Sequence, residues 1–189
     1  MNTASVSLPG LIKKSITWSI VLSLLMILAG LVAVVVPPAA GLAVTILVGW
    51  LLVFSGLMHF VYAWHTRSAG SIVWEVLVGI AYAVVGGYVL LHPLTGMAGL
   101  TLALAIYLLA EAMLEFVLGF QVRARRGSGW LFLDGVITLI LAAMIWRAWP
   151  SSSDWALGIL VGVSMLFSGI SRLMLSMAAR SLVSQTGTV

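Results

Sequence analysis

The sequence predicts an all-α membrane protein with six transmembrane helices, arranged as three tandem two-helix repeats with pseudo-threefold symmetry about the membrane normal. Three observations predict this fold class. The first is composition, because 62% of the 189 residues are hydrophobic and 7% are charged, whereas soluble domains carry about one-quarter charged residues. The second is a series of apolar runs of bilayer-spanning length, and the third is a constant interval between landmark residues along the chain.

The apolar runs are each about 20 residues long, which is the length of helix that crosses a hydrocarbon core of about 30 Å. The predicted helices are residues 16–36, 42–64, 73–91, 97–120, 131–149 and 155–177. The first run follows a pair of lysines, but it exceeds the apolar core of a signal peptide, roughly 7–15 residues, so we expect it to be retained as a helix. Short turns with Pro37, Pro93 and Pro150 join the two helices of each pair, and longer polar linkers join the pairs.

A constant offset relates the three pairs. An offset of 56 residues carries Trp18 to Trp74 and Trp74 to Trp130. The same offset relates Gly30 to Gly86, Pro37 to Pro93, Thr45 to Thr101, Leu52 to Leu108, Phe60 to Phe116 and Arg67 to Arg123. One inserted residue near the third turn changes the offset to 57, which carries Pro93 to Pro150. Because each copy contains two helices, all copies keep one orientation, which predicts the threefold axis and argues against an inverted-repeat transporter.

The positions of the basic residues predict the topology. The predicted segments are a cytoplasmic N-terminal segment of residues 1–15, a transmembrane domain of residues 16–180 with repeats 16–72, 73–128 and 129–180, and a cytoplasmic C-terminal tail of residues 181–189. The basic residues on one predicted side of the membrane are Lys13, Lys14, Arg67, Arg123, Arg125, Arg126 and Arg180. Arg147 lies on the other side. Because basic loops stay in the cytoplasm, both termini are expected to be cytoplasmic.

Polar side chains within the predicted helices are the candidate functional residues, because an ionised carboxylate in hydrocarbon costs at least about 2–3 kcal/mol and needs a partner, water or a proton. The repeat aligns His59, Glu115 and Arg172, each eight residues before the arginine that ends its copy and therefore about 12 Å from that end. The predicted intramembrane polar cluster consists of Glu111, Glu115, Arg172, His59, Ser55 and Ser168. If the second helix of each pair faces the axis, Glu115 pairs with Arg172 beside His59, and Asp134 is the alternative partner of Arg172.

Three interpretations of this cluster stay open from the sequence. The side chains join helices through hydrogen bonds worth about a kcal/mol or less each, or they respond to pH, since a carboxyl group near a histidine can register protons. In the third interpretation they share no site. A small-residue face of Gly79, Ala83 and Gly87 on the third predicted helix separately predicts close helix packing.

Residue types that support other chemistries are missing or scattered. The chain has no cysteine, which leaves no thiolate nucleophile, disulfide or cysteine-based zinc site. The three histidines show no tight metal-ligand spacing, and no phosphate-binding glycine loop, nucleophile elbow or HExxH motif is present. We therefore expect no enzymatic activity, catalytic residue, cofactor or metal. The expected partners are the lipid bilayer and a second copy or another membrane protein, and no nucleic acid.

Each copy combines a small residue in its first helix, a proline at its turn and a second helix with a similar ending. The endings are LLVFSGLMHFVYAWHTR, YLLAEAMLEFVLGFQVR and MLFSGISRLMLSMAAR. In these features, from about Trp18 to Arg180, the chain resembles the HdeD-like acid-resistance membrane proteins, a family of short repeats of unknown function. The resemblance implies a multi-pass protein of the bacterial inner membrane associated with survival of acid stress. It implies no catalytic or transport residue.

Two functions from different classes are compatible with these patterns. The first is a non-enzymatic stress-response protein that acts through membrane integrity or partner binding. The second is a small proton- or ion-linked transporter or channel whose pathway follows the axis past the polar cluster. The first predicts a sealed bundle interior, and the second predicts that water reaches the polar side chains. Six short helices around one axis leave little lumen, which favours the first.

Overall fold

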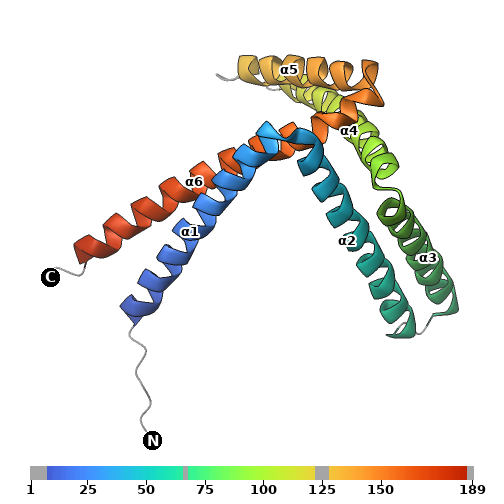
Figure 1. Cartoon of the computed structure of the whole chain (residues 1–189), viewed down its shortest axis with the longest axis horizontal. Coiled ribbons are helices and arrows are strands. Elements are labelled where there is room, and N and C mark those ends of the chain that lie inside the picture. Colours follow the sequence, from blue (N-terminus) through green and yellow to red (C-terminus); the bar gives the residue numbers. More distant parts are fainter. Residues whose placement is uncertain (1–7, 66–67, 122–127, 187–189) are drawn as a thin grey trace, which may run out of the picture. The chain divides into compact units, whose positions relative to one another are not determined.

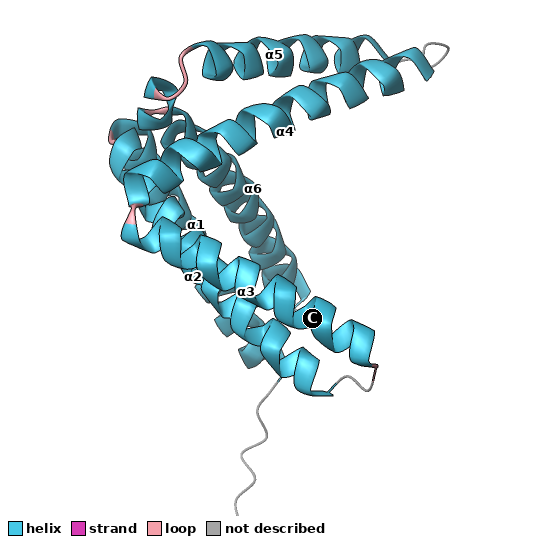
Figure 2. Ribbon diagram, turned by 90° about the vertical axis from the view of Figure 1, so that its right-hand side faces the viewer, coloured by secondary structure: helices cyan, strands magenta, loops and turns pink. Residues whose placement is uncertain are grey.

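The computed structural model describes residues 8–65, 68–121 and 128–186, and the side chains of residues 15–65, 68–121 and 129–180. Its elements are α1 (Leu8–Val35), α2 (Pro37–His65), α3 (Ala69–Leu91), α4 (Pro93–Gln121), α5 (Ser128–Arg147), the 3-10 helix η1 (Ser151–Asp154) and α6 (Ala156–Thr186). All the regular structure in these ranges is helical (Figure 2). Each α-helix contains a segment long and apolar enough to cross a membrane. The predicted all-α class, with six helices long and apolar enough to span a membrane, is therefore confirmed.

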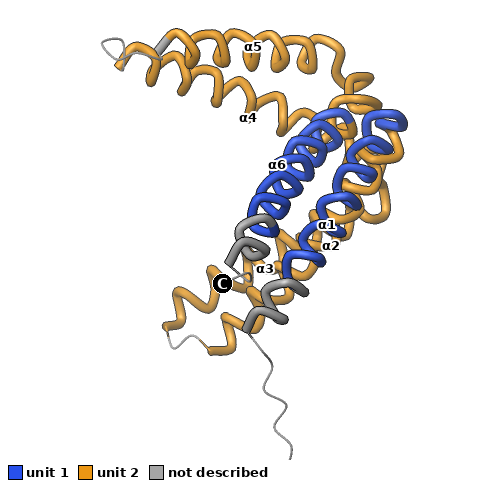
Figure 3. The backbone as a smooth tube through the Cα atoms, turned by 90° about the vertical axis from the view of Figure 1, so that its left-hand side faces the viewer, with its two compact units in different colours: residues 1–37, 159–189 blue, residues 38–158 orange. Residues whose placement is uncertain are grey.

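The chain divides into two compact units (Figure 3). Unit 1 comprises residues 1–37 and 159–189, so it holds α1 and nearly all of α6. Unit 2 comprises residues 38–158 and holds most of α2, all of α3, α4, α5 and η1, and the first residues of α6.

Two of the three turns at the prolines are as short as a turn between helices can be. One residue, Val36, separates α1 from α2, and one residue, His92, separates α3 from α4. Pro37 and Pro93 are the first residues of the following helices, where a missing N–H costs nothing and the fixed φ angle suits a helix. The third turn differs, because η1 lies between α5 and α6. The inserted residue that changes the repeat interval precedes Pro150, so it lies just before η1.

Close packing joins each second helix of a repeat to the first helix of the next repeat. In unit 2, α2 lies beside α3 and α4 lies beside α5 (Figure 1). In unit 1, α6 lies beside α1, although these helices come from opposite ends of the chain. The α2–α3 and α4–α5 contacts therefore join helices across the polar linkers, and the α6–α1 contact joins the two ends of the chain. None of these three contacts joins the two helices of one repeat across its proline turn.

The α2–α3 contact is made by glycines two helical turns apart on each helix. A Cβ atom added to Gly56 would lie 2.7 Å from the carbonyl oxygen of Gly79, and one added to Gly86 would lie 2.8 Å from the carbonyl oxygen of Gly49. Distances this short mean that the two backbones touch. In lipid, where burying leucine gains nothing, such contacts between small residues are the main source of helix association.

The same contact recurs in unit 1 between α6 and α1. A Cβ atom on Gly30 would lie 2.8 Å from the carbonyl oxygen of Gly162, and one on Gly169 would lie 3.1 Å from that of Ser23. The repeat interval carries Gly49 to Gly162 through the intervening copy, so these are equivalent positions.

The α4–α5 pair makes the contact with alanine in place of several glycines. A Cβ atom on Gly135 would lie 3.5 Å from the carbonyl oxygen of Ala112. Ala105 and Ala142, equivalent to Gly49 and Gly86, are 1% and 3% exposed. The repeat seen in the sequence is therefore, in space, a repeat of one small-residue contact between antiparallel helices.

One predicted packing residue is wrong. The structure places Gly79 and Ala83 of the expected face against Gly56, but nothing lies within 4 Å of a Cβ added to Gly87. Gly86 makes the contact instead, because the contacting glycines of α3 are seven residues apart, about two helical turns, and not eight.

The best-packed part of unit 2 is the end where α2, α4 and α6 begin. A Cβ atom on Gly41 would lie 2.9 Å from Sδ of Met97 and 3.7 Å from Cβ of Leu157, so the first turns of the three helices meet. Thr45 and Thr101, which are equivalent in the repeat, are fully buried. Each donates its hydroxyl to the carbonyl oxygen four residues earlier at 2.8 Å, so neither leaves an unpaired donor in the core.

Substitution of two neighbouring glycines tests the contact. Gly86→Ala places a methyl group against the backbone of α2 and is expected to lower the free energy of unfolding by about 1–3 kcal/mol. Gly87→Ala meets open space, so the higher helix propensity of alanine should leave stability unchanged or raise it by up to about 1 kcal/mol. Thermal unfolding of the purified protein in detergent measures both changes. Equal effects of the two substitutions would show that Gly86 is not at a helix contact.

Candidate functional site

His59 of α2 is paired with Glu75 of α3. Its Nδ1 atom lies 2.5 Å from Oε2 of Glu75, and the two side chains are 28% and 29% exposed. The imidazole ring also stacks on the ring of Tyr82, with centroids 5.5 Å apart and planes inclined by 8°. His59 is therefore held between an acidic and an aromatic side chain of the neighbouring helix.

The sequence of α3 explains this arrangement. Glu75, Gly79 and Tyr82 are spaced by four and three residues, so they share one face of the helix. Because Gly79 has no side chain, Cβ of His59 approaches to 3.2 Å from where its Cβ would lie. The imidazole then contacts Glu75, one turn before the glycine, and Tyr82, about one turn after it. Polar pairs between membrane helices contribute around 0.6–2 kcal/mol each.

The predicted cluster omitted Glu75, and a signal in the sequence points to it. Glu75 lies eight residues after Arg67, just as His59 lies eight residues before it. Because α2 and α3 are joined by a short linker around Arg67, these two positions lie at the same height along the paired helices. A search for ion-pair partners across each linker, in place of a search around a central axis, would have found the pair.

Glu115 of α4 occupies the position equivalent to His59, and it faces α5. Its Cβ lies 3.4 Å from where a Cβ on Gly135 would be, and Gly135 is the counterpart of Gly79. The carboxyl group of Glu115 interacts with the side chains of Asp134 and Thr138 of α5. Oε2 of Glu115 is buried and accepts no hydrogen bond from any described residue, so neither neighbour satisfies that atom.

Arg172 of α6 is the third equivalent residue, and it is exposed in unit 1. One turn further along α6, the hydroxyl oxygen of Ser176 lies 2.8 Å from that of Ser19 of α1. Ser19 is the counterpart of Glu75 in the repeat, so a polar contact at this level recurs in the α6–α1 pair. The hydroxyl of Ser23 in turn donates to the carbonyl oxygen of Ser19 at 2.7 Å.

The remaining members of the predicted cluster lie on three helices. Ser55 is half-buried on α2, Glu111 is half-buried on α4 one turn from Glu115, and Ser168 is exposed on α6. The predicted partners of Arg172, namely Glu115 and Asp134, belong to unit 2 whereas Arg172 belongs to unit 1. Those ion pairs, and the convergence of all six residues on an axis, therefore stay predictions.

Within the part of the chain that the structure describes, no three His, Asp, Glu or Cys side chains are grouped so that they could hold a metal ion. The basic residues that predict the topology are mostly beyond that part. Arg67, Arg123, Arg125 and Arg126 lie outside the described residues, as do the side chains of Lys13 and Lys14, so the placement of the termini stays a prediction.

The chain belongs to the family described as "short repeat of unknown function (DUF308)". The family model matches residues 21–91, 77–147 and 146–188, which together span nearly all of the helical region. The first two matches begin at residues 21 and 77 and end at residues 91 and 147, so both boundaries are displaced by 56 residues. This is the interval at which the small-residue contacts recur.

The chain is also similar to Protein HdeD of Escherichia coli strain K12, of Escherichia coli O157:H7 and of Shigella flexneri. Each is 25% identical to the chain over 154 residues, which is 79% of this chain and 80% of the relative. The predicted resemblance to the HdeD-like membrane proteins is thereby confirmed. No solved structure matches the chain.

The His59–Glu75 pair can be measured with a double-mutant cycle. We expect His59→Gln and Glu75→Gln together to cost less than the sum of the single substitutions, with a coupling of about 1 kcal/mol, because the two side chains share one contact. Thermal or denaturant unfolding in detergent gives the four stabilities. As the control, His59→Gln and Glu111→Gln should combine additively, since these residues lie on different helix pairs. A coupling of zero for His59 and Glu75 would mean that their proximity contributes nothing to the α2–α3 contact.

Proposed function

We propose that this DUF308 protein is a non-enzymatic, multi-pass protein of the bacterial inner membrane that supports survival of acid stress, with both termini in the cytoplasm. The similarity to Protein HdeD over most of both chains supports the acid-stress role, which the resemblance to the HdeD-like acid-resistance proteins implies. The pattern of basic residues supports the orientation.

One observation favours a structural role for the intramembrane polar residues over a transport role. His59 contacts Glu75 and Glu115 faces Thr138, in each case across the helix pair to which the residue belongs. Each polar residue follows a small contact residue by three positions, on the face that the neighbouring helix covers. Side chains in this position hold two helices in register, which is what polar groups most often do in helical membrane proteins.

The equivalent contacts also support the proposed pseudo-threefold arrangement. The α2–α3, α4–α5 and α6–α1 pairs use small residues at matching positions of the repeat. Since α6 pairs with α1, the third copy finds its neighbour at the start of the chain. We therefore propose that the three like pairs are related by a pseudo-threefold axis along the membrane normal.

Partners are proposed from the surface of the helices. In the 18-residue apolar stretch of each helix, between 17% and 22% of the residues are buried within the chain. Leucine, valine and aromatic side chains are widely exposed on all six helices. Lipid tails cover such surfaces, and a second copy or another membrane protein has apolar area available on which to pack.

The alternative function is proton- or ion-linked transport, and one observation favours it. Three carboxyl groups, those of Glu111, Glu115 and Asp134, gather on the α4–α5 pair. Ionisable groups inside membrane-spanning helices mark many ion and proton pathways. A transport role would require water to reach these groups and would require them to be essential for flux.

Acid survival and proton flux together distinguish the two functions. A bacterial strain that lacks the gene should regain survival of an acid challenge when it carries the wild type, and equally when it carries Glu111→Gln combined with Glu115→Gln. Liposomes with the wild type should show no proton flux above that of empty liposomes. The double substitution keeps the shape of both side chains, and immunoblotting checks that its amount in the membrane matches the wild type.

Either of two results would contradict the proposal. Proton flux through the wild type that the double substitution abolishes would establish transport in place of the structural role. Identical acid survival with and without the wild-type gene would remove the acid-stress role.

A further inference from the structure

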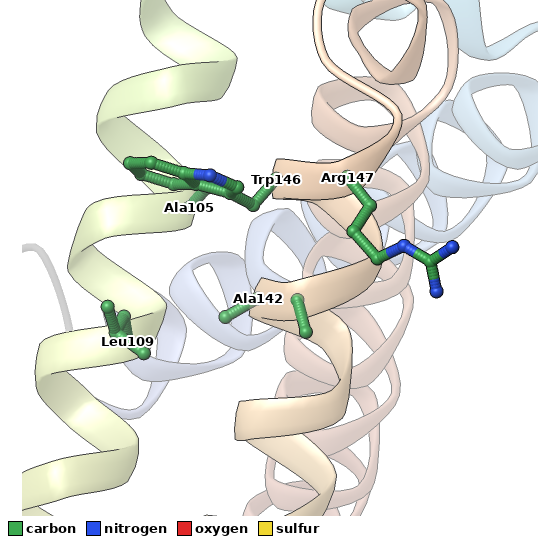
Figure 4. Close-up of a pocket in the computed structure, with 6 residues that line it drawn as sticks. Ala105, Leu109, Ala142, Trp146 and Arg147 are labelled. Carbon is green, nitrogen blue, oxygen red and sulfur yellow. The ribbon is translucent and has the colours of Figure 1, made fainter.

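The α4–α5 pair carries an apolar groove near the end of α5. The groove has a volume of about 290 Å³ and is lined by Ala105, Leu109, Ala142, Ala143, Trp146 and Arg147 (Figure 4). Ala105 and Ala142 are the small contact residues of this pair and are almost fully buried. Their short side chains leave the space that the larger side chains of the groove surround. In Figure 4 the indole of Trp146 reaches toward α4 above this space.

A second groove lies on the adjoining face of α5. It has a volume of about 510 Å³, and its lining residues are Ile140, Ala143, Met144, Arg147, Ala148 and Trp155. Ala143 and Arg147 line both grooves. Two apolar grooves therefore meet at one exposed cation, with a tryptophan beside each.

The charge of Arg147 is not neutralised by a neighbouring carboxylate. The ion pair among the described side chains is that of His59 with Glu75, and no described acidic residue lies within ion-pair distance of Arg147. In Figure 4 its guanidinium group points away from α4, and the residue is exposed. Arg147 ends α5, so it lies where a membrane-spanning helix leaves the hydrocarbon.

We propose that these grooves bind one phospholipid with a negatively charged headgroup, its phosphate on Arg147 and its two acyl chains along the two grooves. Guanidinium groups bind phosphate through paired charge-assisted hydrogen bonds. The apolar walls match acyl chains, and indoles are favoured at the depth of the headgroups. No carboxylate lines either groove to receive a headgroup amine, so an anionic lipid fits better than a zwitterionic one. A protein helix would fill one groove, whereas two chains joined at one phosphate match both.

Lipid-dependent stability tests this site. We expect phosphatidylglycerol to raise the melting temperature of the full-length protein in detergent more than phosphatidylcholine with the same acyl chains does. Arg147→Gln should weaken phosphatidylglycerol binding about fivefold, as expected for the loss of one cation at a membrane surface, and should remove the preference between the lipids. Native mass spectrometry counts the bound lipid in each variant.

Two further variants separate the headgroup from the chains. Ala143→Leu fills the place where both grooves meet, and because Ala143 is exposed the substitution leaves the helix contact intact. It should weaken the binding of both lipids. Arg172→Gln removes another exposed arginine from a different helix and should leave lipid binding unchanged.

Several results would overturn the proposal. Equal stabilisation of the wild type by the two lipids would remove the role of the headgroup charge. Unaltered binding by Ala143→Leu, or equal stabilisation by inorganic phosphate, would show that the grooves hold no acyl chains. Equal losses from Arg147→Gln and Arg172→Gln would reduce the effect to general attraction between cations and anionic lipid.

Discussion

Contact between the backbones of small residues is the interaction on which the rest of this structure depends. In lipid, a helix gains nothing by burying leucine against another helix, so association must come from close packing and from polar contacts. The chain meets this requirement with Gly49, Gly56 and their counterparts. At these residues the backbone of one helix lies against the backbone of its neighbour. Large side chains surround these points and remain exposed to lipid. A larger residue at a contact would therefore separate the two helices with no compensating gain.

The polar positions depend on the same contacts. His59 follows Gly56 by three residues, Glu115 follows Ala112 by three, and Arg172 follows Gly169 by three. Each of these positions therefore lies at the edge of a helix contact, and His59 and Glu115 reach the neighbouring helix there. The two glutamates of α4 have a local explanation in these terms, since Glu115 lies over Gly135 and Glu111 lies one turn away. Because the three equivalent positions hold different polar residues, the stability of each helix pair can change independently of the other two.

The number of helices, their approximate bounds and the interval between copies follow from the sequence, because bilayer thickness and apolar length determine the first two and the tryptophans and prolines reveal the third. The partner of each helix does not follow. Proline turns as short as Val36 suggest that the two helices of one repeat pack together. The small-residue contacts instead join helices of different repeats, across the longer linkers or, for α6 and α1, between the two ends of the chain. For this reason Glu75 is absent from the predicted cluster, and a spacing of four residues predicts Gly87 where the structure uses Gly86. Which helices pack together depends on how their surfaces fit in three dimensions. In a single sequence, the only sign of that fit is the spacing of the small residues.

The central claim is that three equivalent helix pairs build the chain, with α6 paired to α1 of the same molecule. Because the chain has no cysteine, Ser19→Cys combined with Ser176→Cys tests this pair against a clean background, at a position where the two hydroxyl oxygens are 2.8 Å apart. Mild oxidation in native membranes should produce a disulfide within one chain, identified by mass spectrometry of the linked peptides, whereas Ser19→Cys with Ser168→Cys, two turns away, should not. A disulfide that forms only between two chains, or not at all, would contradict the account.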